Sequence, residues 1–167
     1  RDVELEKVRL YNDWMRSRLQ VLRMQMNPHF VCNALNTISS AISADPQRAR
    51  ALVVRFSDLF RRALTLSDAD WVELREELAF VEDYLQLESA RFGARLSFAI
   101  EVESAAARVR VPTLLLQPLI ENAVRHGVAD DRDTLQIAVR ITTVADAGVQ
   151  SGLCVEITNR STGPLPA

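Results

Sequence analysis

The first half of the chain carries apolar residues at the three- and four-residue spacing of amphipathic helices. Up to residue 44 these positions recur with charged residues between them, in a rough heptad that favours a coiled-coil lead-in to a dimer. Pro28 interrupts the pattern, so it either kinks one helix or begins a new one with Asn27 as its N-cap. The pattern therefore predicts helix over residues 1–44, with a kink or a restart at the proline.

Two further helices are expected before Gly93. The first has Asp45 as its cap and Pro46 in its first turn, where a proline fits the helix. The second follows Asp70, which lies three residues before Glu73 in a pattern that resembles a capping box. Gly93 then provides a stop signal.

The second half of the chain changes to the alternating pattern of half-buried strands. Strands are predicted at Leu96–Val102, Leu135–Ile141 and Leu153–Ile157, and an apolar helical segment, Pro112–Val128, lies between the first two. The chain therefore reads as helices followed by a β-α-β-β region. This order predicts an α+β protein, in which a helical module precedes an α/β two-layer sandwich.

Composition narrows the possible classes of function. The chain has 167 residues, of which 48% are hydrophobic and 25% charged, enough for one domain or two small ones. A net charge of −2 does not favour direct nucleic-acid binding. No apolar run approaches the ~18 residues of a membrane span, and both ends look cut from a longer chain. Cys32 and Cys154 have no metal-binding spacing and are expected to be free thiols.

The first candidate site surrounds His29. On a helix His29, Asn33 and Asn36 are spaced i, i+4 and i+7, so they share one face. A neutral imidazole is nucleophilic near pH 7, and on an exposed helix it can attack the γ-phosphate of ATP. Asn33 could hold the ring in one tautomer or place a water for hydrolysis of a phosphohistidine. The alternative is that His29 only completes a helix start after a proline.

The second candidate site lies in the helical segment of the second half. Asn122 and His126 are one turn apart, and Arg125 lies beside them. A neutral amide oxygen suits a Mg²⁺ ion that already carries phosphate, and Arg125 and His126 can meet phosphate oxygens. Glu121 could position a water, and Gly127 ends the helix. The alternative is an ordinary helix with a polar last turn and a glycine cap.

Two motifs resemble those of a known family. Residues 25–30 and 33–36, Gln-Met-Asn-Pro-His-Phe and Asn-Ala-Leu-Asn, resemble the phosphoacceptor box of the LytS-like family of sensor histidine kinases. Residues 115–123, followed by His126 and Gly127, are similar to the N box of its Bergerat-type ATP-binding domain. Because two long motifs occur in the right order over nearly the whole chain, the resemblance is highly specific.

The resemblance implies an organisation of the chain. Residues 1–69 would be a coiled-coil lead-in and a phosphoacceptor hairpin that forms a four-helix bundle in a homodimer. Residues 70–167 would be a linking helix and the N-terminal part of a truncated Bergerat-type sandwich. Because members are usually anchored by N-terminal transmembrane helices, these residues would be the cytoplasmic portion of an inner-membrane sensor.

The resemblance also implies a function. His29 would be phosphorylated from ATP, and the phosphoryl group would pass to an aspartate of a response regulator, often one of LytTR type. Asn122 would bind Mg²⁺, with Arg125 and His126 at the nucleotide and Glu121 and Asn33 assisting catalysis. The runner-up functions are a non-catalytic pseudokinase or phosphotransfer scaffold that binds the regulator, and a structural helical dimer without nucleotide.

Three departures from the family pattern qualify these expectations. Cys32 stands where the family usually has phenylalanine, a change in packing. Asn159 stands where the adenine-binding box usually has aspartate; its carbonyl can still accept a bond from the adenine amino group, without the help of a charge. The glycine-rich box and the ATP lid are not among these residues, so they are expected in a portion of the protein that follows.

Overall fold

The chain divides into two compact units, residues 1–53 and 54–167, each of which is described by itself. Residues 1–26, within the predicted coiled-coil lead-in, lie outside the part of the chain that the structure describes. The domain boundary expected at residues 69–70 stays a prediction. The computed structural model describes residues 27–66, 69–127, 134–146 and 149–161.

The helix that carries His29, α2 (Pro28–Ala44), begins at the proline. The side-chain oxygen of Asn27 accepts a hydrogen bond from the His29 N–H at 3.0 Å, and Pro28 occupies the first helical position. A proline costs nothing there because the first N–H groups of a helix have no partner within it. Of the two alternatives at Pro28, the new helix is therefore confirmed. The helix buries one stripe at a spacing of four residues, formed by Phe30, Ala34 and Ile38.

A single residue, Asp45, connects α2 to α3 (Pro46–Leu66). Its carboxylate accepts the Arg48 N–H at 3.0 Å, so it caps α3 as predicted. Residues 46–53 of α3 belong to the first unit and the rest of the helix to the second. The end of α3 in the second unit is anchored by three buried residues, Leu59, Ala63 and Leu66.

Two short strands of the second unit pair with each other. Strand β1 (Trp71–Glu73) pairs antiparallel with β3 (Arg110–Pro112). The helical segment predicted from Pro112 therefore begins later: α5 is Gln117–Gly127. Pro112 is tolerated at the end of β3 because the strand has only one neighbour, so the missing N–H of proline interrupts no further pairing.

Helix α4 (Leu74–Phe92) starts later than the sequence predicted. The capping box is formed by Glu73 and Glu76, since the Glu73 N–H donates to the Glu76 carboxylate at 3.0 Å. The predicted pairing of Asp70 with Glu73 is wrong because the residues in between are held in strand β1. Gly93, with φ of 63°, ends the helix as predicted, in a conformation that favours glycine.

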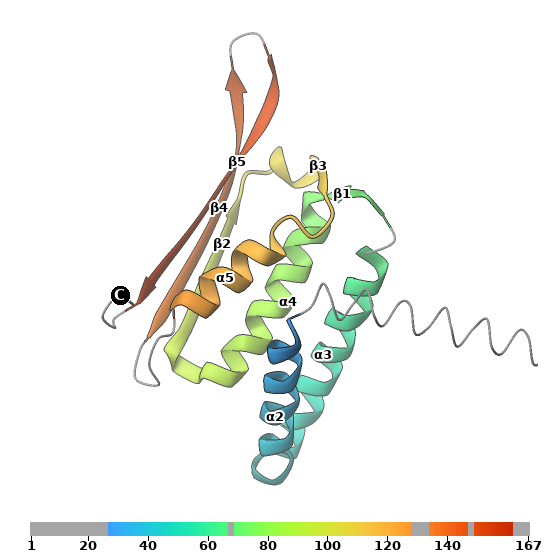
Figure 1. Ribbon diagram of the computed structural model, residues 1–167, viewed down its shortest axis with the longest axis vertical. Coiled ribbons are helices and arrows are strands. Elements are labelled where there is room, and N and C mark those ends of the chain that lie inside the picture. The colour runs from blue at the N-terminus through green and yellow to red at the C-terminus, as the bar shows by residue number, and fades with distance from the viewer. Residues whose placement is uncertain (1–26, 67–68, 128–133, 147–148, 162–167) are drawn as a thin grey trace, which may run out of the picture. The chain divides into compact units, whose positions relative to one another are not determined.

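The second unit contains a three-stranded sheet of β2 (Leu96–Val102), β4 (Leu135–Asp146) and β5 (Val149–Ser161). Strands β2 and β4 are parallel, and β4 and β5 are antiparallel. Helix α5 forms the crossover between the two parallel strands, and α4 and α5 lie on one face of the sheet (Figure 1). The expected order of a helical module and a two-layer unit is confirmed.

The core of the second unit lies between this sheet and its two helices. Along the central strand β4, buried apolar residues alternate with exposed residues, so one face of the sheet is covered and the other is open. The helices contribute apolar residues from α4 and α5 to the same layer. The largest fully buried side chains include Phe80, Leu85, Ile120, Leu135, Ile137 and Ile141.

Gly127 provides a test of this packing. A Cβ atom there would lie 2.2 Å from Cδ1 of Leu135, which is fully buried and has little room to move. We expect Gly127→Ala to lower the free energy of unfolding by about 1–3 kcal/mol in urea denaturation. Gly152→Ala is the matched control, because no atom lies within 4 Å of a Cβ at Gly152. Equal stability of the two variants would contradict the close approach of α5 to β4.

Candidate functional site

His29 lies in the first turn of α2 and is exposed to solvent. The amide nitrogen of Asn33 lies 3.1 Å from its Nδ1 and 3.4 Å from its Nε2. An amide nitrogen can only donate, so the ring nitrogen that it contacts must be the unprotonated one. The geometry therefore allows Asn33 to hold a neutral imidazole in one tautomer, the first of the two roles considered for it.

The same face of α2 continues with polar, exposed positions. Asn36 is exposed, as its i+7 spacing from His29 predicted, while Phe30 and Ala34 are buried on another side of the helix. Because the ring of His29 is not enclosed by its own helix, a phosphoryl donor or a partner can approach it from solvent. This geometry fits a reactive surface residue, and the alternative, a histidine that only completes the helix start, is left to experiment.

The second cluster lines a shallow hollow between α5 and β5. Its residues come from one face of α5 and from the inward-facing positions of β5. The hollow brings Asn122 and His126 together with Asn159, which is 33 or more residues away in sequence. The lining residues are Leu119, Asn122, Ala123, His126, Val155, Ile157 and Asn159.

Hydrogen bonds hold the polar groups of this hollow. A guanidinium nitrogen of Arg125 donates to the side-chain oxygen of Asn122 at 2.8 Å and lies 3.3 Å from Nε2 of His126. The Asn159 amide nitrogen donates to the carbonyl of Ala123 at 3.2 Å. This bond ties β5 to α5 and leaves the carbonyl oxygen of Asn159 to act as an acceptor. An aspartate at this position could not donate such a bond.

Glu121 lies on another side of α5 from the hollow. It is half-buried, and it accepts a bond from the side-chain amide of Gln117 at 2.7 Å. Burial raises the pKa of Glu121, while the bond from Gln117 and the charge of Arg125 lower it. Burial is the main cause of the raised pKa values of Tyr84 and Glu88 on α4, and the charge of Glu121 raises both further. The structure thus places Glu121 towards α4, and its predicted role in catalysis stays a prediction.

Glu88 provides a test of this buried polar layer. It is 3% exposed, and burial raises its pKa although Arg91 lies 3.1 Å away. A raised pKa means that the folded state binds the proton more tightly than the unfolded state, so the stabilising contribution is present at low pH. It is lost as pH rises through the raised pKa. We therefore expect the free energy of unfolding of Glu88→Gln, relative to the unmutated protein, to rise as pH increases above the ordinary pKa of a glutamate.

The control for this titration is Glu103→Gln. The backbone N–H and hydroxyl of Thr143 bind the Glu103 carboxylate and lower its pKa. A lowered pKa contributes stability above the unfolded value, and the contribution is lost as pH falls. The relative stability of this variant should therefore fall as pH rises in the acid range, opposite to Glu88→Gln. Chemical denaturation at each pH measures both, and a pH-independent difference for Glu88→Gln would contradict the burial effect.

One buried contact beside α5 was not predicted from the sequence. Glu77 on α4 is 1% exposed, and its carboxylate accepts bonds from the N–H groups of Leu114 and Leu116. Next to Glu76 it looks like an ordinary surface glutamate. The available signal was its spacing, because Glu77 falls on the same helix stripe as buried Leu74 and Val81.

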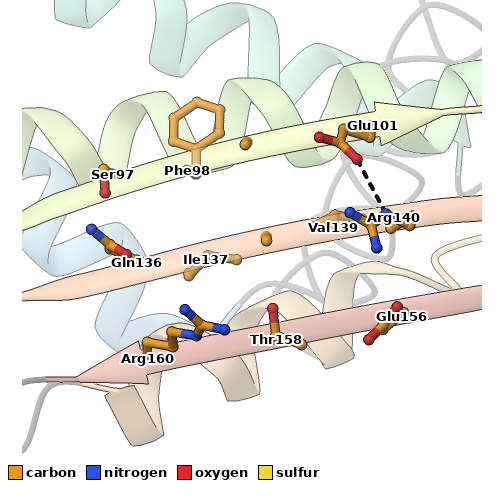
Figure 2. Close-up of a pocket in the computed structure, with 12 residues that line it drawn as sticks. Ser97, Phe98, Glu101, Gln136, Ile137, Val139, Arg140, Glu156, Thr158 and Arg160 are labelled. Atoms are coloured by element: carbon orange, nitrogen blue, oxygen red, sulfur yellow. Dashed lines mark hydrogen bonds and ion pairs between the residues drawn. The ribbon is translucent and has the colours of Figure 1, made fainter.

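The outer face of the sheet holds a second hollow, which contains none of the predicted site residues. Figure 2 shows it lined by polar side chains of β2, β4 and β5, with Arg140 bonded to Glu101 at 3.1 Å. It forms where the small residues Ala99 and Ala138 pair, between rows of longer side chains. Both candidate phosphate-binding residues, Arg125 and His126, lie instead on α5, on the covered side of the sheet.

A helix with an exposed histidine, followed by a small α/β unit with a polar cluster on its crossover helix, is compatible with a histidine kinase. A family model described as histidine kinase matches residues 17–96. Together with the relatives below, this shows that the chain belongs to the LytS-like family of sensor histidine kinases.

Three relatives illustrate the similarity. Sensor histidine kinase BtsS of Escherichia coli (strain K12) is 39% identical over 74% of this chain and 22% of its own length. Sensor histidine kinase YpdA of the same strain is 33% identical over 89% of this chain and 26% of its length. Sensor protein LytS of Bacillus subtilis (strain 168) is 33% identical over 74% and 21%, respectively. The chain thus spans about a quarter of the length of these relatives.

Proposed function

We propose that this chain is the phosphoacceptor and ATP-binding core of a sensor histidine kinase in a two-component system. The observation that carries the proposal is the exposed His29, held by the Asn33 amide at 3.1 Å within the region that matches the histidine kinase family. Incubation of the whole protein with ATP labelled in the γ-phosphate tests it. We expect an acid-labile, base-stable label on the protein.

The proposed step is a transfer of the γ-phosphoryl group to the imidazole. The unprotonated ring nitrogen of His29, once the Asn33 amide releases it, forms a bond to the γ-phosphorus, and the bond from that phosphorus to the bridging oxygen breaks. ADP leaves with the electron pair, and the ring proton passes to solvent, to which His29 is exposed. In the second step a carboxylate oxygen of the regulator's aspartate takes the phosphoryl group and the imidazole is restored.

The hollow between α5 and β5 is the proposed nucleotide site. The donor set fits Mg²⁺-ATP, because Asn122 offers a neutral oxygen for the ion while Arg125 and His126 can meet phosphate oxygens. Arg125 now donates to that Asn122 oxygen and would turn to the phosphates instead. Bound Mg²⁺ would neutralise phosphate charge. The carbonyl of Asn159 would accept a bond from the adenine amino group.

The proposed architecture is a Bergerat-type domain behind a dimerising helical hairpin. The mixed sheet with α4 and α5 on one face supports the first part. Exposed apolar side chains on the helices of the first unit support a homodimeric four-helix bundle, because such residues favour contact with another apolar face. These residues are Leu35, Ile42 and Val53, which are 51%, 58% and 47% exposed.

A response regulator with an acceptor aspartate, of LytTR type, is the proposed partner, and an inner membrane is the proposed location of the whole sensor. Both follow from family membership. In the described ranges, no helix is long and apolar enough to cross a bilayer.

One observation favours a second function, a non-catalytic scaffold that dimerises and binds the regulator. Asn159 stands at the position of the aspartate of the adenine-binding box, and its amide nitrogen donates to the carbonyl of Ala123. A neutral acceptor binds the adenine amino group more weakly than a carboxylate does. Calorimetry separates the two functions, since measurable binding of Mg²⁺-ATP would count against the scaffold.

Asn33 has a separable role in this proposal. If it places the water that hydrolyses the phosphorylated state, Asn33→Ala should lower phosphatase activity about tenfold and autophosphorylation much less, because only the former needs that amide in the transition state. Following the decay of phosphorylated regulator and the rate of labelling in parallel measures both. Asn36→Ala, on the same face of α2, is the control. Equal losses in Asn33→Ala would mean that Asn33 only orients the ring.

A further inference from the structure

The loop that precedes α5 is held by a carboxylate from another helix. Glu77 of α4 accepts the Leu114 N–H at 2.5 Å with one oxygen and the Leu116 N–H at 3.1 Å with the other. Its side chain is 1% exposed, so water does not compete for these bonds. Hydrogen bonds from N–H groups to a buried charge are among the stronger ones in proteins.

The conformation of this loop needs such support. Leu114 has φ of 59°, in the left-handed region that is unfavourable for residues other than glycine. Neighbouring bonds hold the start of the loop, where the Thr113 N–H donates to the carbonyl of Asp70 at 3.1 Å. Glu77 holds the next residues, and the strained backbone persists because the surrounding contacts determine it.

The same contact reaches the first turn of α5. The Leu116 carbonyl accepts the Ile120 N–H at 3.0 Å, so the residue that Glu77 binds is also the first acceptor of the helix. A negative charge at this end of a helix is favoured by the helix dipole. Burial raises the pKa of Glu77, and its backbone hydrogen bonds oppose this rise. The N–H groups of the loop thus favour the charged form of the carboxylate that holds them.

We propose that Glu77 is a positioning residue for the nucleotide site. Its carboxylate holds residues 114–116 and so sets where α5 lies along β5, which places Asn122 and His126 beside Asn159. The part that concerns nucleotide rests on the proposed function above. The part that concerns the position of α5 does not.

The test compares Glu77→Gln with Glu88→Gln in the whole protein. The first variant keeps the size of the side chain but replaces one accepting oxygen with an NH₂ group, which cannot accept. The second removes another buried carboxylate of α4, which accepts a bond from Arg91. Both variants are compared at a temperature where denaturation curves show them folded. If Glu77→Gln does not fold, Glu77→Asp is used instead, because its side chain is too short to reach both N–H groups.

The first readout is amide hydrogen exchange in peptides that cover residues 113–120 and 117–127. We expect exchange to accelerate roughly tenfold in the Glu77 variant and to stay unchanged in Glu88→Gln. Unchanged exchange in Glu77→Gln overturns the proposal, whatever the protein does with ATP. Faster exchange across both peptides supports it even if the unmutated protein binds no nucleotide, an outcome that would instead refute the proposed ATP site.

The second readout separates position from general stability. We expect the KM for ATP in autophosphorylation to rise roughly tenfold in Glu77→Gln, with the rate at saturating ATP changed less than about threefold, because the substrate-binding groups move while His29 does not. In Glu88→Gln both constants should stay near those of the unmutated protein. If Glu77→Gln keeps the original KM and the original affinity for Mg²⁺-ATP, Glu77 does not position the site.

Discussion

His29→Gln is expected to remove all acid-labile phosphoryl label from the protein after incubation with labelled ATP. A glutamine amide nitrogen carries no available lone pair, so it cannot attack phosphorus as an imidazole does. The exposed position of His29 means that the substitution should leave folding unchanged. Its binding of Mg²⁺-ATP should also persist, which distinguishes a lost phosphoacceptor from a damaged nucleotide site.

Two features of the chain provide controls for this variant. Asn36→Ala, on the same exposed face of α2, should be labelled like the unmutated protein. The sequence has two histidines, and the other, His126, lies on α5. Acid-labile label that persists in His29→Gln would refute the assignment of the phosphoacceptor and would direct attention to His126.

Asn122→Asp is expected to weaken the binding of Mg²⁺-ATP severely. A carboxylate at this position would pair with Arg125, whose guanidinium already donates to the Asn122 oxygen at 2.8 Å. That ion pair would keep Arg125 from the phosphates, and the added negative charge would repel them. Charge-assisted bonds are about twice as strong as neutral ones, so the expected loss of affinity is on the order of a hundredfold.

Calorimetric titration with Mg²⁺-ATP measures this loss. Glu156→Gln is the matched control, since Glu156 lies on the same strand as Asn159 but on the outer face of the sheet (Figure 2). Its affinity should be unchanged. An affinity of Asn122→Asp within threefold of the unmutated protein would show that the hollow between α5 and β5 is not the nucleotide site.

Local chemistry allowed the helix starts near the first site to be predicted from the sequence. The His29 N–H donates to Asn27 and the Arg48 N–H donates to Asp45. These bonds span two or three residues, so no distant part of the chain is needed to form them. The shared face of His29 and Asn33 follows in the same way from helical periodicity. The strands were predictable for a similar reason, because the alternation of apolar and polar residues in β4 matches its covered and exposed faces.

Positions that depend on pairing between distant residues were not predictable. Residues 71–73 pair with 110–112, and this strand moved the start of α4 beyond the expected capping box at Asp70. The same pairing, together with the turn after it, delayed the start of α5 to Gln117. In both places a tertiary hydrogen-bond ladder overrode a local signal of comparable strength.

Helical periodicity alone was enough to predict that His29 and Asn33 share a face and that Asn122, Arg125 and His126 share the end of one helix, because these relations span at most one or two helical turns. Tertiary packing was needed to bring Asn159 to the cluster on α5, to turn Glu121 towards α4 and to place Glu77 against the loop before α5. Each of these contacts joins residues more than 30 positions apart, and such contacts form only when the sheet and its two helices pack together.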